Sequence, residues 1–360
     1  MNLRIPGPTP LPSEVLQAMS KQMINHRGPE YMAMQRDIIK KLQGIFQTES
    51  DVFLFTSSGT GGVEAAIVNT LSPGDKVLAV AAGVFGDRFA ACAEAFGAEV
   101  IKLDFPWGQA ADPEAIRERL KANPDTKAVL VVFNETSTGV TNDLGAIAKV
   151  VHESSDALLL VDAISGLGAI DLPTDEWGCD VVVTGSQKAW MCPPGLAMVS
   201  VSPKAWEAYA EAKMPRYYWD FTAMKDFAER GQTPFTPALT TIFALNQALE
   251  IFLAEGMENV FARHKRVGEH TRAGVKELGL ELFADESCAS NTVTAIKVPP
   301  DIKADELLRM MREEYDIMIA GGMGKLKGQI VRIGHLGYVF EEDIDDVLQA
   351  MEASLARLKG

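Results

Sequence analysis

Short apolar runs alternate with amphipathic stretches over the first two thirds of the chain. Residues 181–184, Val-Val-Val-Thr, are apolar on both faces, which is typical of a strand buried inside a parallel sheet. Further strands are predicted at residues 52–55, 76–80, 99–103, 128–133, 157–161 and 196–201. Helical periodicity is found at residues 30–46, 63–67, 86–96, 144–152 and 203–213, and after Asp112. Because alternating strands and helices form βαβ units, we expect an α/β fold with a mainly parallel central sheet wrapped by helices.

The pattern changes at Gly256, which follows a long predicted helix over residues 238–254. Beyond it, helices are predicted at residues 257–278, 304–315 and 341–358, and strands at residues 292–298, 317–320 and 329–333. At the other end, prolines at 6, 8, 10 and 12 predict an extended arm, followed by a helix from Ser13. We therefore expect an arm and helix start over 1–20, a large domain over 21–255 and a small α+β domain over 256–360.

Composition and charge narrow the class of protein. The 360 residues are 47% hydrophobic and carry a net charge of -15, with no basic run, so we expect neither nucleic acid nor a membrane as a partner. The four cysteines are dispersed without a CxxC motif, which argues for a reducing compartment and against a metal site. The amino end lacks the apolar core of a signal peptide, and no apolar run approaches the roughly 20 residues of a membrane helix. We expect a cytoplasmic protein.

Lys188 stands in the loop after the predicted strand 181–184, and Pro193-Pro194-Gly195 prevents an ordinary helix there. Open α/β sheets hold ligands outside the carboxyl ends of their strands. A lysine at that edge can form a Schiff base with a carbonyl cofactor. Taken alone, a solvated loop lysine is the commoner interpretation.

A turn rich in glycine and hydroxyl groups, residues 56–62, links the strand at 52–55 to a helix. Free backbone N–H groups at a helix start bind anions, and the hydroxyl groups of Ser58 and Thr60 add donors, so the turn is a candidate phosphate site. It is not a P-loop, because no Gly-Lys-Ser/Thr follows. The alternative is that Thr60 merely caps the helix.

Asp162 and Arg332 are charged residues beside apolar strand residues. Asp162 directly follows the apolar run 157–161, so its carboxylate needs a partner, and a protonated pyridine nitrogen would serve. Capping of the next turn, or pairing with an arginine, is the alternative. Arg332 lies between Val331 and Ile333, and its planar guanidinium suits a carboxylate, although an intramolecular salt bridge is equally consistent.

With these residues, the chain resembles the class V, fold-type I aminotransferases that use pyridoxal 5′-phosphate (PLP). The resemblance is greatest to the alanine–glyoxylate and serine–pyruvate (serine–glyoxylate) group and covers nearly the whole length. It rests on the order of these motifs: Pro6-Gly7-Pro8, Ser58-Gly59-Thr60, Glu135-Thr136-Ser137-Thr138-Gly139, Val161-Asp162, Gly185-Ser186-Gln187-Lys188, Pro193-Pro194-Gly195-Leu196, Thr236-Pro237 and Val331-Arg332-Ile333-Gly334.

The resemblance implies a role for each site residue. Lys188 would be the Schiff-base lysine and the base that moves the proton, and Asp162 would keep the cofactor ring nitrogen protonated. Arg332 would bind the substrate carboxylate, with Gly7 beside it. The phosphate would be bound by Ser58, Gly59, Thr60, Gln187, Thr233 and Thr236. Thr236 would come from a second subunit, which implies a homodimer with shared active sites. The ring would contact Thr136, Ile164 and Phe85, where tryptophan is common in the family and core packing is the alternative for Phe85.

The function that the resemblance implies is ping-pong transamination from a small amino acid, alanine or serine, to a 2-oxo acid, glyoxylate or pyruvate. No second arginine is clearly committed to a side-chain carboxylate, although Arg27, Arg216 and Arg230 are loop candidates. Aspartate- or phosphoserine-type aminotransferases are therefore alternatives. A cysteine desulfurase or lyase would need Cys288 as its reactive thiol, and a catalytically idle family member is a further alternative. The role of Asn25-His26-Arg27 stays open.

Overall fold

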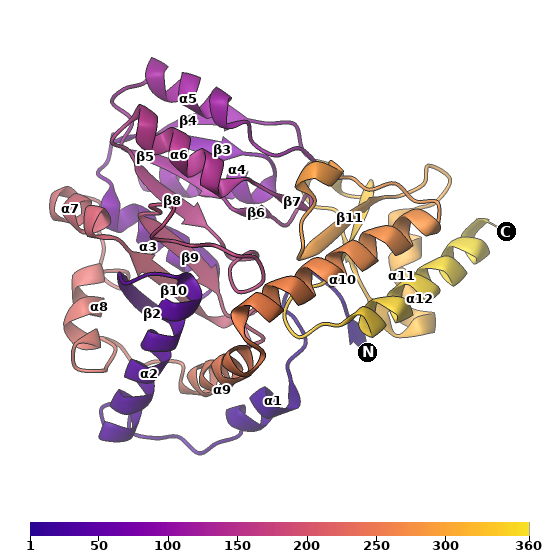
Figure 1. The fold of residues 1–360 in the computed structure, drawn as a ribbon, viewed down its shortest axis with the longest axis horizontal. Coiled ribbons are helices and arrows are strands. Elements are labelled where there is room, and N and C mark those ends of the chain that lie inside the picture. Colours follow the sequence, from indigo (N-terminus) through magenta and orange to yellow (C-terminus); the bar gives the residue numbers. More distant parts are fainter. Residues whose placement is uncertain (360) are drawn as a thin grey trace.

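The computed structural model describes residues 1–359 and is built around a seven-stranded sheet (Figure 1). Its strands lie in the order β2 (Asp51–Ser57), β10 (Gly195–Val201), β9 (Val181–Gly185), β8 (Leu158–Asp162), β5 (Ala128–Val132), β3 (Lys76–Ala81) and β4 (Glu99–Asp104). Only β10 runs antiparallel to its neighbours in this sheet. The predicted mainly parallel α/β fold is therefore confirmed.

Helices cover both faces of the large sheet. Successive side chains of a strand point to opposite faces, so each buried strand contributes apolar residues to both layers. Leu78 of β3, for example, belongs to one apolar layer and Val77 to the other. The first layer is completed by α1 (Ser13–Met19), α2 (Pro29–Phe46), α5 (Pro113–Ala122), α6 (Leu144–Ser154) and α9 (Leu239–Glu255). The second is completed by α3 (Gly59–Thr70), α4 (Val84–Ala95), α7 (Pro203–Glu211) and α8 (Phe221–Ala228).

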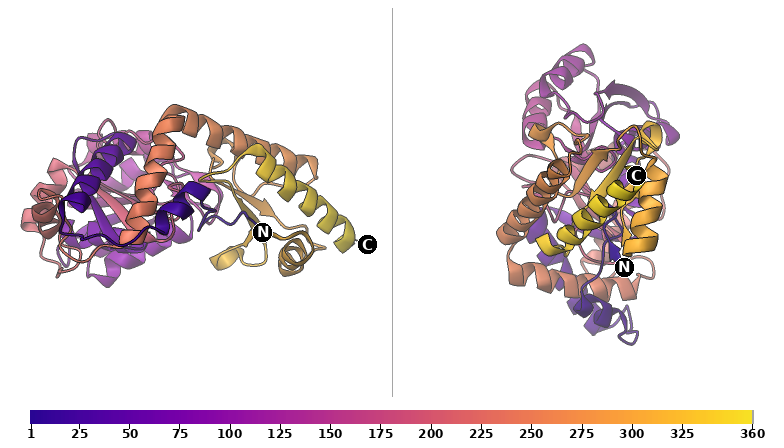
Figure 2. Two further views of the ribbon diagram at one scale, coloured as in Figure 1. Left: turned by 90° about the horizontal axis from the view of Figure 1, so that it is seen from below. Right: turned by 90° about the vertical axis from the view of Figure 1, so that its right-hand side faces the viewer.

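The residues after Gly256 pack around an apolar cluster of their own, which lies to one side of the large sheet (Figure 2). Its sheet has the antiparallel order β11 (Val293–Lys297), β14 (Ile330–Gly334) and β13 (Ala320–Gly321). Its helices are α10 (Met257–Glu277), α11 (Ala304–Tyr315) and α12 (Glu341–Lys359), with short 3₁₀ turns at Glu286–Cys288 and Gly324–Leu326. No helix within residues 1–359 is both long enough and apolar enough to cross a membrane.

The amino-terminal residues join the C-terminal part to the loop that carries Lys188. Strand β1 (Asn2–Leu3) pairs in parallel with β12 (Ile317–Met318), and Arg4 forms an ion pair of 2.7 Å with Asp343. The chain then runs extended towards the large sheet, where Thr9 Oγ1 donates a 3.0 Å hydrogen bond to the carbonyl of Lys188. The arm thus touches both parts of the molecule.

Local differences from the sequence-based expectation have physical causes. The predicted strand 317–320 is wrong as a single element, because β12 pairs with β1 whereas β13 pairs with β14 in another sheet. Helix α8, for which no helix was predicted, follows the aromatic residues 217–219. Its N-cap, Asp220, accepts a 2.8 Å hydrogen bond from Ala223 N. Strand β5 is followed by the small hairpin of β6 (Asn134–Glu135) and β7 (Val140–Thr141).

Candidate active site

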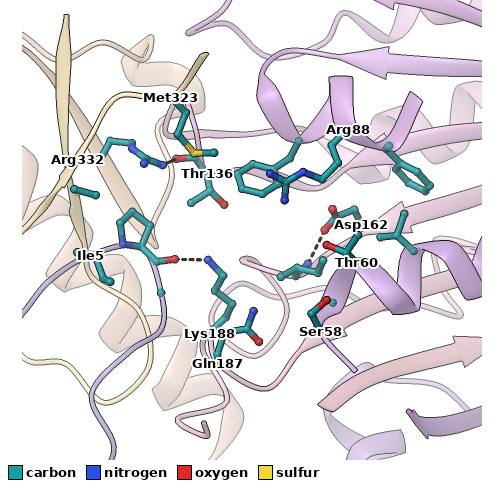
Figure 3. Close-up of a pocket in the computed structure, with 18 of the residues that line it drawn as sticks. Ile5, Ser58, Thr60, Arg88, Thr136, Asp162, Gln187, Lys188, Met323 and Arg332 are labelled. Atoms are coloured by element: carbon teal, nitrogen blue, oxygen red, sulfur yellow. Dashed lines mark hydrogen bonds between the residues drawn. The ribbon is translucent and has the colours of Figure 1, made fainter. Parts of the chain in front are cut away.

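A cavity of about 390 Å³ lies beyond the carboxyl ends of β8 and β9, between the large sheet and the C-terminal strands (Figure 3). Most of the predicted site residues line it. These are Gly7, Ser58, Gly59, Thr60, Phe85, Thr136, Asp162, Ile164, Gln187, Lys188 and Arg332. Thr233 and Thr236 lie elsewhere, beside Tyr218. Segments that are far apart in the sequence therefore meet at one edge of the sheet.

The amine of Lys188 enters this cavity from the loop after β9. Its Nζ donates a hydrogen bond to the carbonyl oxygen of Pro6 in the arm (Figure 3). Burial lowers the pKa of Lys188 to about 8, and the positive charge of Arg332 adds to the effect. Gly7 makes the close approach of the arm possible, because its φ is +112° and a Cβ there would lie 2.7 Å from Lys188 Cδ. The solvated-loop interpretation of Lys188 is wrong.

Asp162 is the last residue of β8 and is only 7% exposed. Its Oδ1 accepts a 2.9 Å hydrogen bond from Ile164 N, so it does cap the following turn. Between residues 1 and 359 its other oxygen, Oδ2, has no hydrogen-bond or ion-pair partner, and the carboxylate points into the cavity (Figure 3). Burial raises the pKa of Asp162 to about 6. A donor or cation placed in the cavity would satisfy this carboxylate.

The turn before α3 supplies a free helix start. The N-cap is Ser58, with no hydrogen bond from its side chain to the helix, so the interpretation of Thr60 as the cap is wrong. Gly59 lies against Ile164, where a Cβ would come within 2.5 Å of the isoleucine Cδ1. Close by, Gln187 Oε1 is buried and has no hydrogen-bond partner in the described part of the chain. The amides at the helix start supply the donors that an anion requires, and Gln187 would add its Nε2, since its Oε1 can only accept.

Arg332, in β14, reaches the cavity from the opposite side and is 6% exposed. Its Nε donates to Gly321 O and its Nη1 to Thr136 O, each over 3.0 Å. No carboxylate of residues 1–359 forms an ion pair with it, so the intramolecular salt bridge is not found. Burial lowers the pKa of Arg332 to about 10, but the guanidinium stays charged near neutral pH. Its Nη2 is left to bind an anion.

Helix α4 forms a wall of the cavity with Phe85, Arg88, Phe89 and Cys92. The guanidinium carbon of Arg88 lies 4.8 Å from the centroid of the Phe85 ring. Sequence reasoning missed Arg88, although its position one helical turn after Phe85 was a usable signal. The cavity lining also includes Pro6, which belongs to the first motif, and Ile5, Val63, Ala320 and Met323, which no motif indicated.

The other arginine candidates lie outside this cavity. Arg27 donates to Thr233 O over 2.6 Å and to Pro234 O over 3.1 Å, so it holds the loop that leads to α9. Arg216 binds the carbonyl of Val68 and the carboxylate of Asp220, whereas Arg230 lies over a phenylalanine ring. None of these three arginines lines the cavity of its own chain.

Cys288 also lies away from the cavity, in the 3₁₀ turn Glu286–Cys288, where its Sγ is 3.4 Å from Asp285 O. A desulfurase needs a thiol that reaches the substrate sulfur. The placement of Cys288 within its own chain does not provide one.

A family model described as aminotransferase class-V matches residues 1–347. The chain belongs to this family and is an aminotransferase, as its fold and the resemblance of its motifs led us to expect.

Among relatives, the chain is 46% identical over 358 residues to a protein of Synechococcus sp. named soluble hydrogenase, small subunit (99% of this chain, 93% of the relative). It is 42% identical over 338 residues to the L-aspartate–glyoxylate aminotransferase of Paracoccus denitrificans (92% and 85%). It is 38% identical over 360 residues to the serine–glyoxylate aminotransferase of Arabidopsis thaliana (98% and 90%). Among solved structures, ureidoglycine–glyoxylate aminotransferase from Bacillus subtilis superposes with a TM-score of 0.95 at 32% identity, covering 100% of this chain and 94% of that chain.

Proposed function

We propose that this aminotransferase uses PLP to move the amino group of a small amino acid, alanine or serine, to glyoxylate or pyruvate by a ping-pong mechanism. The observation that carries the proposal is the cavity in which Lys188, Asp162 and Arg332 converge. The acceptor is supported by relatives that are named for glyoxylate. The donor is supported by the modest size of the cavity, in which Arg332 of strand β14 can bind its α-carboxylate.

The residues in the cavity fit PLP. The cofactor has an aldehyde, a ring nitrogen and a phosphate. Here the cavity offers an amine, a buried carboxylate with one free oxygen, and an uncapped helix start whose amides can donate to a phosphate. When bound, PLP supplies a ring that withdraws electrons from the α-carbon of the amino acid.

The residues of this chain would bind and orient the substrate and the cofactor and would transfer the proton. Asp162 would hold the proton on the ring nitrogen, because its raised pKa makes a shared proton favourable. Arg332 would bind the α-carboxylate and so orient the α-hydrogen towards Lys188. The Nζ of Lys188, which is neutral above about pH 8, would accept that proton and later return it. The start of α3, with Ser58 and Thr60, would hold the phosphate, and Gly59 would leave it room.

A single-turnover experiment tests the function. Purified enzyme loaded with PLP is mixed with alanine, serine or aspartate, and absorbance follows conversion of the cofactor from its aldehyde to its amine form. Glyoxylate or pyruvate should then restore the aldehyde form. If none of the three amino acids converts the cofactor, the proposal is wrong.

Arg88 favours a second class of donor, the acidic amino acids. It is a second guanidinium in the cavity, without a hydrogen bond or ion pair among residues 1–359, and could take a side-chain carboxylate. In Arg88→Gln, we expect the kcat/KM for aspartate to fall about 10- to 100-fold and that for alanine to change little, since a hydrogen bond to a charged group contributes roughly 1.5–3 kcal/mol.

Arg332→Gln is the matched control for this comparison. It should raise the KM for both donors, because every amino acid presents an α-carboxylate. Steady-state kinetics with the two donors separates the roles. Equal losses for alanine and aspartate in Arg88→Gln would remove the case for an acidic donor.

The pH dependence of cofactor capture follows from the pKa of Lys188. Only the neutral amine attacks an aldehyde, so below about pH 8 we expect the rate at which the apoenzyme captures PLP to rise about tenfold per pH unit and then to level off. Stopped-flow absorbance measures this rate. In Arg332→Gln the pH at which the capture rate is half-maximal should be higher, because the charge of Arg332 helps to lower the pKa of Lys188. A rate that does not vary between about pH 7 and pH 9 would contradict this assignment.

We also propose an obligate homodimer, a division of the chain near Gly256, and a cytoplasmic location. The dimer is supported by the placement of Thr233 and Thr236 outside their own chain's cavity, where Thr236 is exposed and could serve a second copy. The division is supported by the separate apolar cluster after Gly256. The location is supported by four cysteines that all remain free thiols. Sedimentation of the holoenzyme as a monomer would contradict the dimer.

A further inference from the structure

Glu135 is a completely buried carboxylate that no step above uses. It ends β6, directly before Thr136, and is 0% exposed. Its Oε2 accepts hydrogen bonds of 3.1 Å from both Phe85 N and Gly86 N. Its Oε1 accepts from Ser137 N over 3.1 Å and from the hydroxyl of Ser137. A buried carboxylate with this many donors is held in one orientation.

Two of these donors, Phe85 N and Gly86 N, are amides in the first turn of α4. The helix has no capping side chain of its own, because its N-cap is Gly83. The amide of Val84 is bound by Ser137 Oγ over 3.0 Å, and the amides of Phe85 and Gly86 are bound by Glu135. Glu135 and Ser137 therefore replace a missing cap, and the negative charge lies at the positive end of the helix.

The space around Gly83 matches this arrangement. A Cβ at Gly83 would come within 2.4 Å of Glu135 Cδ and 2.5 Å of Ser137 Oγ. A conventional N-cap side chain therefore has no room, since the carboxylate from β6 already occupies the place. The first turn of α4 is fixed by a residue about 50 positions away, which ties the helix to the hairpin of β6 and β7 (Figure 1).

Helix α4 carries Phe85 and Arg88, which both line the cavity, and Arg88 lies across it from Lys188 (Figure 3). A small rotation of the first turn of α4 would move Phe85 away from the PLP ring, which Phe85 is proposed to contact. We propose that Glu135 is a positioning residue for the cofactor site: its carboxylate fixes the start of α4 and thereby holds Phe85 in place. This inference rests on the proposed use of PLP and adds a residue that acts on the cofactor through Phe85. The charge of Glu135 also raises the pKa of Asp162 and of Arg332.

The test is a double-mutant cycle on the holoenzyme with Glu135→Gln and Phe85→Ala. The amide of glutamine keeps the shape of glutamate but places an NH₂ donor against N–H or O–H donors. The readouts are the rate at which PLP leaves during dialysis, the kcat and KM for alanine, and amide hydrogen exchange of residues 84–87 in the apoenzyme. Glu153→Gln, an exposed carboxylate of α6, is the matched control and should behave as the unmodified enzyme.

For Glu135→Gln we expect PLP to leave about tenfold faster or more, kcat to fall with little change in KM, and exchange of residues 84–87 to accelerate. If Glu135 acts through Phe85, the double variant should lose PLP no faster than Phe85→Ala alone. Unchanged PLP release, or losses that simply add in the double variant, would overturn the inference.

Two further comparisons make the result of this experiment unambiguous. Should Glu135→Gln fail to fold, Ser137→Ala removes the acceptor for Val84 N and the hydroxyl that donates to Glu135 Oε1. The same cycle with Phe85→Ala then applies with smaller effects. If the unmodified enzyme binds no PLP, the proposed function fails; if it binds PLP and transaminates while the variants release PLP normally, only the role of Glu135 fails.

Discussion

Replacing Lys188 by alanine should lower transamination by about 10⁴-fold or more, because the variant loses the amine that we propose both holds the cofactor and moves the proton. Borohydride reduction should no longer attach the cofactor to the protein. The measurement is kcat with alanine and glyoxylate, together with the mass of the reduced protein. Methylamine should restore a small part of the rate, since a free amine can carry the proton.

Lys204→Ala is the matched control for this substitution. Lys204 donates to Ala157 O, outside the cavity. Its removal should leave kcat and covalent attachment intact. If Lys188→Ala retained more than about a hundredth of the activity, a different base would be at work.

Replacing Asp162 by asparagine should have the second-largest effect. An amide has the shape of the carboxylate but cannot keep a proton on the ring nitrogen, so we expect kcat to fall about 10²–10⁴-fold. Binding of PLP should be weakened far less than kcat, because the phosphate and Lys188 contacts remain. Single-turnover kinetics and PLP titration separate these two quantities.

Asp180→Asn is the control for losing a buried carboxylate that lies outside the cavity. Asp180 is 3% exposed and accepts hydrogen bonds from Leu159 N over 2.8 Å and Ser202 Oγ, but it does not line the cavity. Its replacement should lower the melting temperature without changing kcat per folded molecule. Equal losses of kcat in the two variants would mean that Asp162 is structural.

Sequence patterns located the residues that follow strands more reliably than those on helices. Lys188 and Asp162 could be placed because parallel strands end at one edge of a sheet, and Ser58 because a glycine-rich turn precedes a helix. Arg88 was missed because its place in the cavity depends on how α4 packs, which periodicity alone does not give. Arg332 and Gly7 come from distant segments, and only the family resemblance put them in the same site.

Pairing partners were the least predictable part of the fold. Residues 317–321 have strand character throughout, but β12 and β13 belong to different sheets because β1 approaches from the other end of the chain. The role of Glu135 was hidden for the same reason. Nothing near it in the sequence shows that the amides it binds belong to a helix about 50 residues earlier.

The arm has a practical consequence for handling the protein. The amino group of Met1 lies 2.6 Å from the carboxylate of Asp316, next to β12, and Pro6 in the same arm accepts the hydrogen bond from Lys188. A purification tag fused to the amino end would therefore lie a few residues from the segment that binds Lys188, whereas a tag after α12 would leave this connection undisturbed.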